Sequence, residues 1–173
     1  MRPRRAAPGG AVSKAGTREV RPLPSPKVLA VRMLARREFS RAELSQRLAR
    51  KGVARDDIER TLDELAASGY LSDARYAQAV VAQRSGRYGK RAIAYELREK
   101  GIAAPEANAA MAPLAAVDEL DDATALWQHR FGTAPVNQKE KARQVRFLLS
   151  RGYGMSVALR VIRAAGAAAD EDN

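Results

Sequence analysis

The sequence predicts an all-α protein built of three tandem three-helix repeats. The first observation is a spacing that occurs three times: a leucine, a glycine four residues later, and a large apolar residue directly after the glycine. These sets are Leu48–Gly52–Val53, Leu97–Gly101–Ile102 and Leu148–Gly152–Tyr153. A period of about fifty residues is typical of stacked supersecondary units. The second observation is that no stretch shows the period-two alternation of a β-strand.

A row of small helical units makes an elongated body, either straight or curved. Such a body is better suited to lying along a polymer than to enclosing a small molecule. Aromatic residues make up only 5% of the chain, so aliphatic residues have to fill the core. Helices of about ten to fifteen residues are marginal on their own in water, and we therefore expect packing between helices to hold each repeat together.

Composition divides the chain into five segments. The N-terminal segment is rich in Pro, Gly, Ala and Arg and has no helical periodicity, which is typical of disorder. It either touches phosphate or stays solvated. The expected boundaries are a disordered basic arm at 1–26, repeats at 27–72, 73–116 and 117–166, and a loose acidic tail at 167–173.

Repeat 1 has clear start and stop signals for its helices. Pro26 suits the first turn of the first helix, and Ser40-x-x-Glu43 is a capping box that begins the second. Gly52 and Gly69 supply the positive φ that ends the second and third helices. Apolar residues at helical spacing mark the three helices: Val28, Val31 and Leu34; Leu44 and Leu48; Ile58, Leu62 and Leu65.

Repeats 2 and 3 follow the same plan. Ser72 is the expected N-cap of the first helix in repeat 2, and Pro105 suits the first turn of its third helix. The loop at 132–138 in repeat 3 is longer than its counterparts. The apolar residues that mark the three helices of repeat 2 are, in order, Tyr76, Ala79 and Val80; Ile93 and Leu97; Met111 and Leu114. Those that mark the three helices of repeat 3 are Leu126 and Trp127; Val145, Leu148 and Leu149; Val157, Val161 and Ile162.

Charge narrows the class of partner. The chain has 31 basic and 20 acidic residues, a net charge of +11, which favours nucleic acid, an acidic protein surface or an anionic membrane. There is no cysteine, so disulfides, thiol catalysis and Cys-ligated metal are excluded. No apolar run approaches the roughly 20 residues of a membrane span, and the N-terminus lacks a signal-peptide core. We expect a cytoplasmic protein that does not bind membranes.

The first basic surface is expected in repeat 2. At 100° per residue, Arg91, Tyr95 and Arg98 share one helix face, opposite Ile93 and Leu97. An aromatic ring flanked by two arginines can stack on a base or brace a phosphate contact. The alternative is a solvated face with Tyr95 packed and half-buried.

The second basic surface is expected in repeat 3. Residues 139–163 carry seven basic residues against one acidic, a net +6, whereas 102–138 carry five acidic residues against one basic, a net −4. The acidic block pairs either with neighbouring repeats or with a partner. The candidate residues for binding a filament or DNA are Arg84, Arg87, Lys90, Arg91, Tyr95, Arg98, Lys100, Lys139, Arg143, Arg146 and Arg151.

No constellation of residues indicates catalysis. His129 is the single histidine and has no second histidine or cysteine to share a metal with. The glycines at 86 and 89 are too close together for a phosphate-binding loop, and no Lys-Ser/Thr follows them; they either make a turn or let the chain approach a partner's backbone. We expect no catalytic residue, no metal and no cofactor, and hence no enzyme.

Several of these segments resemble the RecX family. Residues 84–102, RSGRYGKRAIAYELREKGI, resemble its central motif, as do the preceding residues 69–77, GYLSDARYA. Residues 34–52 fit the family's first repeat, and Arg130–Phe131–Gly132 with 141–153 fits the third. The resemblance covers about 27–165 and does not include the basic arm.

The resemblance implies three tandem three-helix repeats and a non-enzymatic regulator of the RecA recombinase. Such a regulator binds the RecA filament on single-stranded DNA and usually inhibits its ATPase and strand exchange, and it thereby acts in homologous recombination, DNA repair and the SOS response. We expect a monomer, and from the charge we expect weak binding of single-stranded DNA without sequence preference, with duplex binding left open. The alternative function is a stand-alone helix-turn-helix DNA-binding protein.

Overall fold

The computed structural model describes residues 24–171, with side chains through residue 167. Within that range the chain is all-helical, as the sequence predicts. The helices are α1 Pro26–Leu34, α2 Arg41–Arg50, α3 Arg55–Ala67, α4 Asp73–Arg84, α5 Lys90–Glu99, α6 Ala104–Ala115, α7 Leu120–Arg130, α8 Gln138–Ser150 and α9 Met155–Glu171. The predicted basic arm falls almost wholly outside the described residues.

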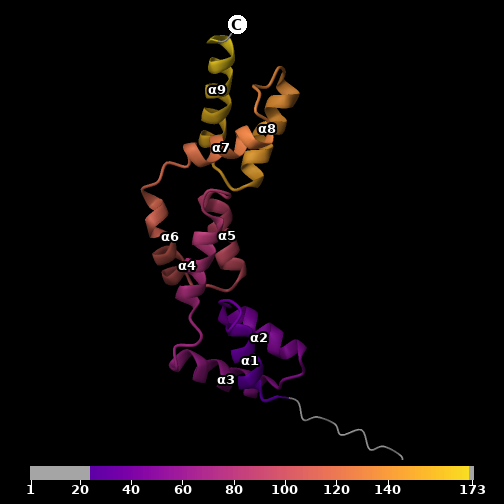
Figure 1. Ribbon diagram of the computed structural model, residues 1–173, viewed down its shortest axis with the longest axis vertical. Helices are drawn as coiled ribbons and strands as arrows, with labels where there is room; N and C mark the ends of the chain where they lie inside the picture. The colour runs from indigo at the N-terminus through magenta and orange to yellow at the C-terminus, as the bar shows by residue number, and fades with distance from the viewer. Residues whose placement is uncertain (1–23, 172–173) are drawn as a thin grey trace, which may run out of the picture.

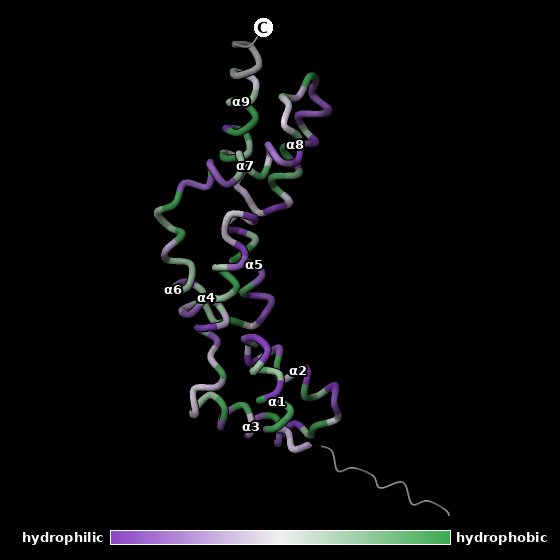
Figure 2. The backbone as a smooth tube through the Cα atoms, in the orientation of Figure 1, coloured by the Kyte–Doolittle hydropathy of each residue, from purple (hydrophilic) through white to green (hydrophobic). Residues whose placement is uncertain are grey.

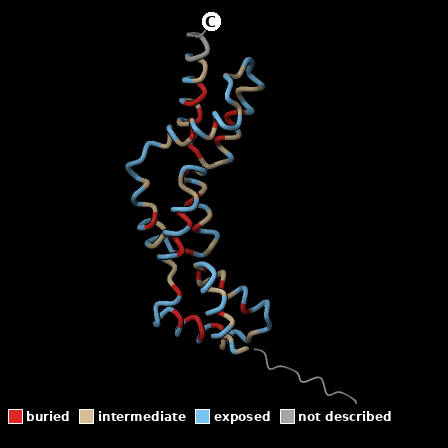
Figure 3. The backbone as a smooth tube through the Cα atoms, in the orientation of Figure 1, coloured by how far each residue is buried: buried red, intermediate tan, exposed pale blue. Residues whose placement is uncertain are grey.

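The helices form three units that follow one another along an elongated body (Figure 1). Unit 1 contains α1–α3, unit 2 contains α4–α6 and unit 3 contains α7–α9. Each unit closes its own hydrophobic core, and Figure 3 shows the buried residues in three groups along the long axis. The tandem three-helix arrangement is therefore confirmed.

The repeated leucines lie at the centres of these cores. Leu48, Leu97 and Leu148 are all fully buried, and burying such a side chain stabilises a fold by about 2 kcal/mol. Along most helices, apolar and hydrophilic residues alternate in short blocks (Figure 2), as expected of helices that bury one face. Three small cores of this kind replace one large one.

Helix α1 begins where the sequence predicts but buries a different face. Val28 and Val31 are 42% and 36% exposed, whereas Ala30 is fully buried in the unit 1 core. Leu29 and Met33 pack against that core beside it. A small residue lets α1 approach its neighbours closely, and helical spacing alone does not distinguish this face from the valine face.

Serine caps start α2 and α4 as predicted. The Ser40 Oγ accepts a hydrogen bond from the Glu43 amide at 3.1 Å, and Ser72 caps α4 in the same way through the Arg75 amide. The Glu43 carboxylate is bound by the Arg37 guanidinium at 2.6 Å. This ion pair lowers the pKa of Glu43 below its usual value and joins α2 to the segment before it.

The three repeated glycines end the second helix of each unit. Gly52, Gly101 and Gly152 have φ of +82°, +74° and +87°, which confirms that they form helix C-caps. Gly101 and Gly152 also lie against the preceding unit, because a Cβ on either would meet Ala42 or Ala92. A Cβ on Gly52 would meet nothing within 4 Å among the described residues.

These glycine turns join the units end to end, and we call the two junctions seams. At the first seam, between units 1 and 2, the Ser40 Oγ donates a hydrogen bond to the Lys100 carbonyl at 2.8 Å. At the second seam, between units 2 and 3, the Gly89 amide donates to the Arg151 carbonyl at 2.9 Å. In both, the N-terminus of one second helix meets the C-terminal turn of the next, so α2, α5 and α8 follow one another along the long axis (Figure 1).

A carboxylate completes each seam. The Arg41 amide donates to Asp73 at 2.7 Å, and the Lys90 amide donates to Glu119 at 2.6 Å. Each acceptor lies at the start of the next unit, and each donor is the first residue of a helix, where negative charge is favourable. Glu119 belongs to the acidic block of the sequence, so this part of the block pairs with a neighbouring unit.

The C-terminal helix is longer than the sequence predicts. Helix α9 continues through Gly166 to Glu171, where we expected a loose tail from residue 167. The residues around Gly166 are almost all alanines, which have the highest helix propensity, and this outweighs the roughly 1 kcal/mol that one glycine costs a helix.

Candidate nucleic-acid interface

Helix α5 presents the arginine–tyrosine face that the sequence predicts. Arg91, Tyr95 and Arg98 are exposed, Tyr95 to 55%, while Ile93 and Leu97 on the other face are buried. The Arg98 guanidinium lies 5.3 Å from the centre of the Tyr95 ring. Tyr95 is therefore not a packing residue of the core, and its ring is open to a partner.

Two of the predicted basic residues hold unit 2 together. The Arg84 guanidinium donates two hydrogen bonds to Glu96, at 2.8 and 2.9 Å, and this pairing raises the pKa of Arg84. The Lys90 Nζ donates to the Val117 carbonyl at 2.8 Å. A phosphate contact by either residue would have to compete with these bonds.

The remaining predicted residues of unit 2 lie in different places. Arg87 is exposed in the loop between α4 and α5. Lys100 is half-buried at the first seam. Neither lies on the Arg91–Tyr95–Arg98 face of α5, so the structure brings together only part of the predicted set in this unit.

Arg151 connects units 2 and 3. Its guanidinium lies 5.4 Å from the Tyr88 ring of unit 2 and 5.4 Å from the Phe147 ring of unit 3. Its backbone carbonyl accepts the Gly89 hydrogen bond at the second seam. The side chain is therefore placed between two aromatic rings at the seam itself.

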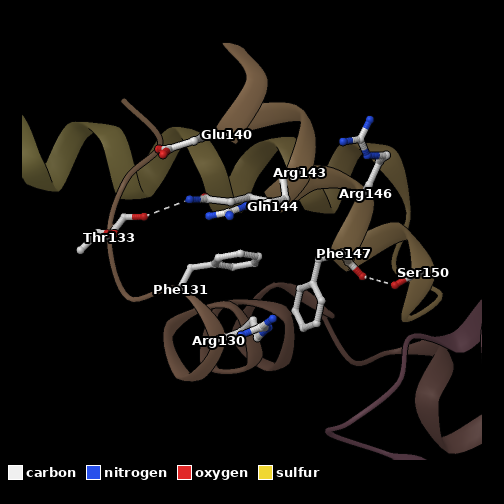
Figure 4. Close-up of a pocket in the computed structure, with 9 residues that line it drawn as sticks. All are labelled: Arg130, Phe131, Thr133, Glu140, Arg143, Gln144, Arg146, Phe147 and Ser150. Atoms are coloured by element: carbon white, nitrogen blue, oxygen red, sulfur yellow. Dashed lines mark hydrogen bonds between the residues drawn. The ribbon is translucent and has the colours of Figure 1, made fainter. Parts of the chain in front are cut away.

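Unit 3 contains an open cavity of about 530 Å³ beside α8. Figure 4 shows the side chains that line it, drawn from the end of α7, the following loop and one face of α8. They include two of the predicted basic residues, Arg143 and Arg146, and also Arg130. Lys139, the third member of the predicted stripe, is exposed near the start of α8 but does not line the cavity.

Two aromatic rings form the apolar part of this cavity. The Phe131 and Phe147 rings meet edge to face, with centroids 5.4 Å apart, a favourable geometry for an aromatic pair. Arg143 and Arg130 lie 5.5 and 5.7 Å from the Phe131 ring, and in Figure 4 they approach it from opposite sides. Cationic and aromatic groups thus alternate along the cavity wall.

Gln144 forms the floor of the cavity. It is buried, its Oε1 accepts a hydrogen bond from the Trp127 indole at 2.8 Å, and its Nε2 donates to the Thr133 carbonyl at 3.2 Å. These bonds tie the loop after α7 to the core of unit 3. The cavity therefore has a hydrogen-bonded floor beneath exposed arginine side chains.

The sequence reasoning missed Phe131, Phe147 and Gln144. Arg143 and Phe147 are four residues apart on α8, so a basic stripe next to an aromatic residue was visible in the sequence. The pairing of Phe147 with Phe131 was not, because it depends on how the loop at 132–137 returns the chain to α8.

The described residues contain neither a metal-binding cluster nor a membrane-spanning helix. No group of three or more His, Asp or Glu residues within 24–171 is arranged to hold a metal ion. None of the helices in that range combines the length and apolar character needed to cross a bilayer.

Three stretches of the chain match the three-helix domains of RecX in order. Residues 27–65 match the first domain, 72–111 the second and 117–162 the third. These stretches coincide closely with units 1, 2 and 3.

Curated relatives and solved structures agree with these matches. The chain is 44% identical to the regulatory protein RecX of Leptothrix cholodnii, over 88% of this chain and 97% of the relative. It is 38% identical to that of Ralstonia nicotianae, over 84% and 91%. The crystal structure of RecX from Lactobacillus salivarius superposes with a TM-score of 0.66 at 18% identity, covering 82% of this chain and 94% of that one. The chain therefore belongs to the RecX family of regulatory proteins.

Proposed function

We propose that this protein regulates the RecA recombinase by lying along the RecA filament on single-stranded DNA. Binding through several weak contacts, spread over successive units, would slow the filament's ATPase and strand exchange. Avidity of this kind gives useful affinity without one deep pocket. The membership of the chain in the RecX family supports RecA as the partner.

The observation that carries the proposal is a pair of exposed basic surfaces on consecutive units. One is the Arg91–Tyr95–Arg98 face of α5, and the other is the Arg143–Arg146 stripe of α8. Within the described residues none of these arginines lies in an ion pair. Since α5 and α8 follow one another end to end at the second seam, an extended polyanion lying along the long axis would pass both helices.

The helix-turn-helix alternative has less support in units 1 and 2. In three-helix DNA-binding modules the third helix reads the major groove, and here these helices are α3, α6 and α9. Helix α3 carries five acidic residues against two basic ones, and α6 carries one acidic residue and no basic one. Duplex phosphates would repel α3 and gain nothing from α6.

The test of the proposal is RecA's DNA-dependent ATPase and strand exchange with increasing amounts of the purified protein. We expect inhibition by the wild type and much weaker inhibition by the double variant Arg91→Glu with Arg98→Glu. The matched control reverses Arg50 and Arg163, which are exposed and outside both surfaces, and should behave as the wild type. Unchanged RecA activity at saturating wild-type protein would rule the proposal out.

A further inference from the structure

We propose that the cavity of unit 3 binds one unstacked nucleotide of a DNA single strand. The base would pack against Phe131 and Phe147, and Arg143 and Arg146 would hold the adjoining phosphates. This inference rests on the proposed function, because it names the ligand of one of its two basic surfaces. A volume of about 530 Å³ falls within the range of about 300–1,000 Å³ of small-ligand sites.

The charge of the cavity is suited to a phosphate. Arg130, Arg143 and Arg146 line it, and none of them has an ion-pair partner among the described residues. The one acidic lining residue, Glu140, accepts a hydrogen bond from the Val136 amide at 3.1 Å. In Figure 4 it lies at the Thr133 end, away from Arg146 and Phe147. The arginines are thus free to bind an incoming anion.

The aromatic pair is suited to a base. Both rings are partly exposed. Phe147 has Phe131 at 5.4 Å and Arg151 at 5.4 Å, and Phe131 lies between Arg130 and Arg143, so a base that stacks on Phe131 takes the place of Arg143, which then turns to the phosphate. Bases that are not stacked in a duplex pack on aromatic rings and on arginine planes, and this cavity offers both next to each other. A duplex keeps its bases stacked inside, so the cavity favours a single strand.

The polar groups of the cavity explain why the binding would not depend on sequence. Gln144 uses both ends of its amide on Trp127 and Thr133, and the Ser150 hydroxyl donates to the Phe147 carbonyl at 2.7 Å. Gln144 is buried and both side chains are held by these bonds, so neither is well placed to read the edges of a base. Stacking and charge remain, and neither distinguishes strongly between bases.

The experiment measures binding of the full-length protein to a labelled oligo(dT) and to an abasic strand of equal length, without RecA. For Phe147→Leu, which keeps apolar bulk, we expect about fivefold or greater loss of affinity for oligo(dT), the lower range for one stacked base, and no loss for the abasic strand. For Arg143→Ala with Arg146→Ala we expect both affinities to fall. Tyr70→Leu and Arg163→Ala, exposed residues outside the cavity, are the matched controls.

Three results would overturn the inference. The first is equal oligo(dT) affinity for Phe147→Leu and the wild type, with circular dichroism showing that both are folded. The second is equal binding of oligo(dT) and the abasic strand by the wild type. The third is displacement of oligo(dT) by dTMP at equal nucleotide concentration, which would assign the cavity to free nucleotides. Because RecA is absent, these results are independent of the RecA assays that test the proposed function.

Discussion

The amide of Gly89 donates a hydrogen bond to the carbonyl of Arg151 at 2.9 Å, which ties the start of α5 to the end of α8. The backbones touch at this point, since a Cβ on Gly89 would lie 2.5 Å from the carbonyl carbon of Gly152. The glycine at 89 is therefore required for close approach. The approaching backbone belongs to the same chain, whereas the sequence left open a turn or an approach to a partner's backbone.

A comparison of alanine variants at Gly52 and Gly152 measures how much the close contact at the second seam contributes to stability. Gly52→Ala and Gly152→Ala both place a side chain at positive φ, which costs roughly 1–2 kcal/mol. Only the second also meets a neighbour, because its Cβ would lie 2.5 Å from the Ala92 amide nitrogen. Overpacking of this kind costs about 1–3 kcal/mol. We expect urea unfolding to show Gly152→Ala as the less stable variant by that additional amount.

Gly166→Ala is the internal control for this comparison. Gly166 lies inside α9 with nothing near its missing Cβ, so alanine there should raise stability by about 0.5–1 kcal/mol. Equal destabilisation by the Gly52 and Gly152 variants would mean that the second seam tolerates a methyl group and is looser than described.

Arg84 and Arg91 should separate stability from binding. Arg84→Ala breaks the two-bond pair with Glu96, whose side chains are only about a third exposed, and we expect it to lose up to about 1 kcal/mol of stability. Arg91→Ala removes an exposed side chain that has no ion-pair partner in the part of the chain that the structure describes, and it should leave the melting temperature unchanged while weakening binding to single-stranded DNA. Melting curves and anisotropy titrations of the two variants give the comparison. If Arg84→Ala weakened DNA binding without loss of stability and Arg91→Ala lowered the melting temperature, Arg84 would be the DNA contact and Arg91 the residue that stabilises the fold.

Tyr153 predicts a change of stability at alkaline pH. Its ring is buried, its hydroxyl has no hydrogen-bond partner among the described residues, and burial raises its pKa to about 12. Because the unfolded chain ionises near pH 10 and the folded chain only near its raised pKa of about 12, the fold keeps its full stability below pH 10 and loses stability as the pH rises from 10 toward 12. Tyr153→Phe should remove this loss.

The same variant has a second expected result. Phenylalanine leaves no buried hydroxyl unpaired, so Tyr153→Phe should be as stable as the wild type at neutral pH or more stable. Urea midpoints measured from neutral pH to about pH 11 would show the curves of the two proteins diverging. If the urea midpoints of the two proteins changed in parallel with pH, Tyr153 would have the same pKa in the folded and the unfolded chain.

Salt should weaken binding to single-stranded DNA steeply. Four to six contacts with phosphates give a log–log slope of about −3 to −4, at roughly −0.7 per contact. Arg143→Ala with Arg146→Ala should reduce the magnitude of that slope by about 1.4, and titrations at several salt concentrations measure it. A flat response in the wild type would exclude phosphate contacts as the main source of affinity.

The sequence predicted the local features of this fold well. Gly52, Gly101 and Gly152 end their helices and Ser40 begins one because caps depend on a few neighbouring residues. The full extent of α9 was missed because we gave Gly166 more weight than the alanines around it. The exposed face of α5 was predicted because the rotation of about 100° per residue in a helix fixes which residues share a face, without any knowledge of the neighbouring helices.

Contacts between distant segments could not be predicted in the same way. The seam at Gly89, the Phe131–Phe147 pair and the engagement of Arg84 by Glu96 each depend on tertiary packing. For Arg84 and Lys90 the sequence shows only a positive charge. It does not distinguish a basic residue that is bonded within the fold from one that is exposed and able to bind DNA. The cavity of unit 3 depends in addition on the loop at 132–137. The sequence shows the length of this loop but not the path that it takes.

The seams have a consequence for how this family can diverge. Each seam hydrogen bond has a main-chain group on at least one side, and a peptide group is the same in every residue; the side-chain partners are Ser40, Asp73 and Glu119. Substitutions elsewhere can then accumulate while the units keep their order and spacing, provided that these few side chains persist and that glycine persists where backbones touch. A relative with 18% of its residues in common can thus retain the same fold, while the side chains on its surface are free to change.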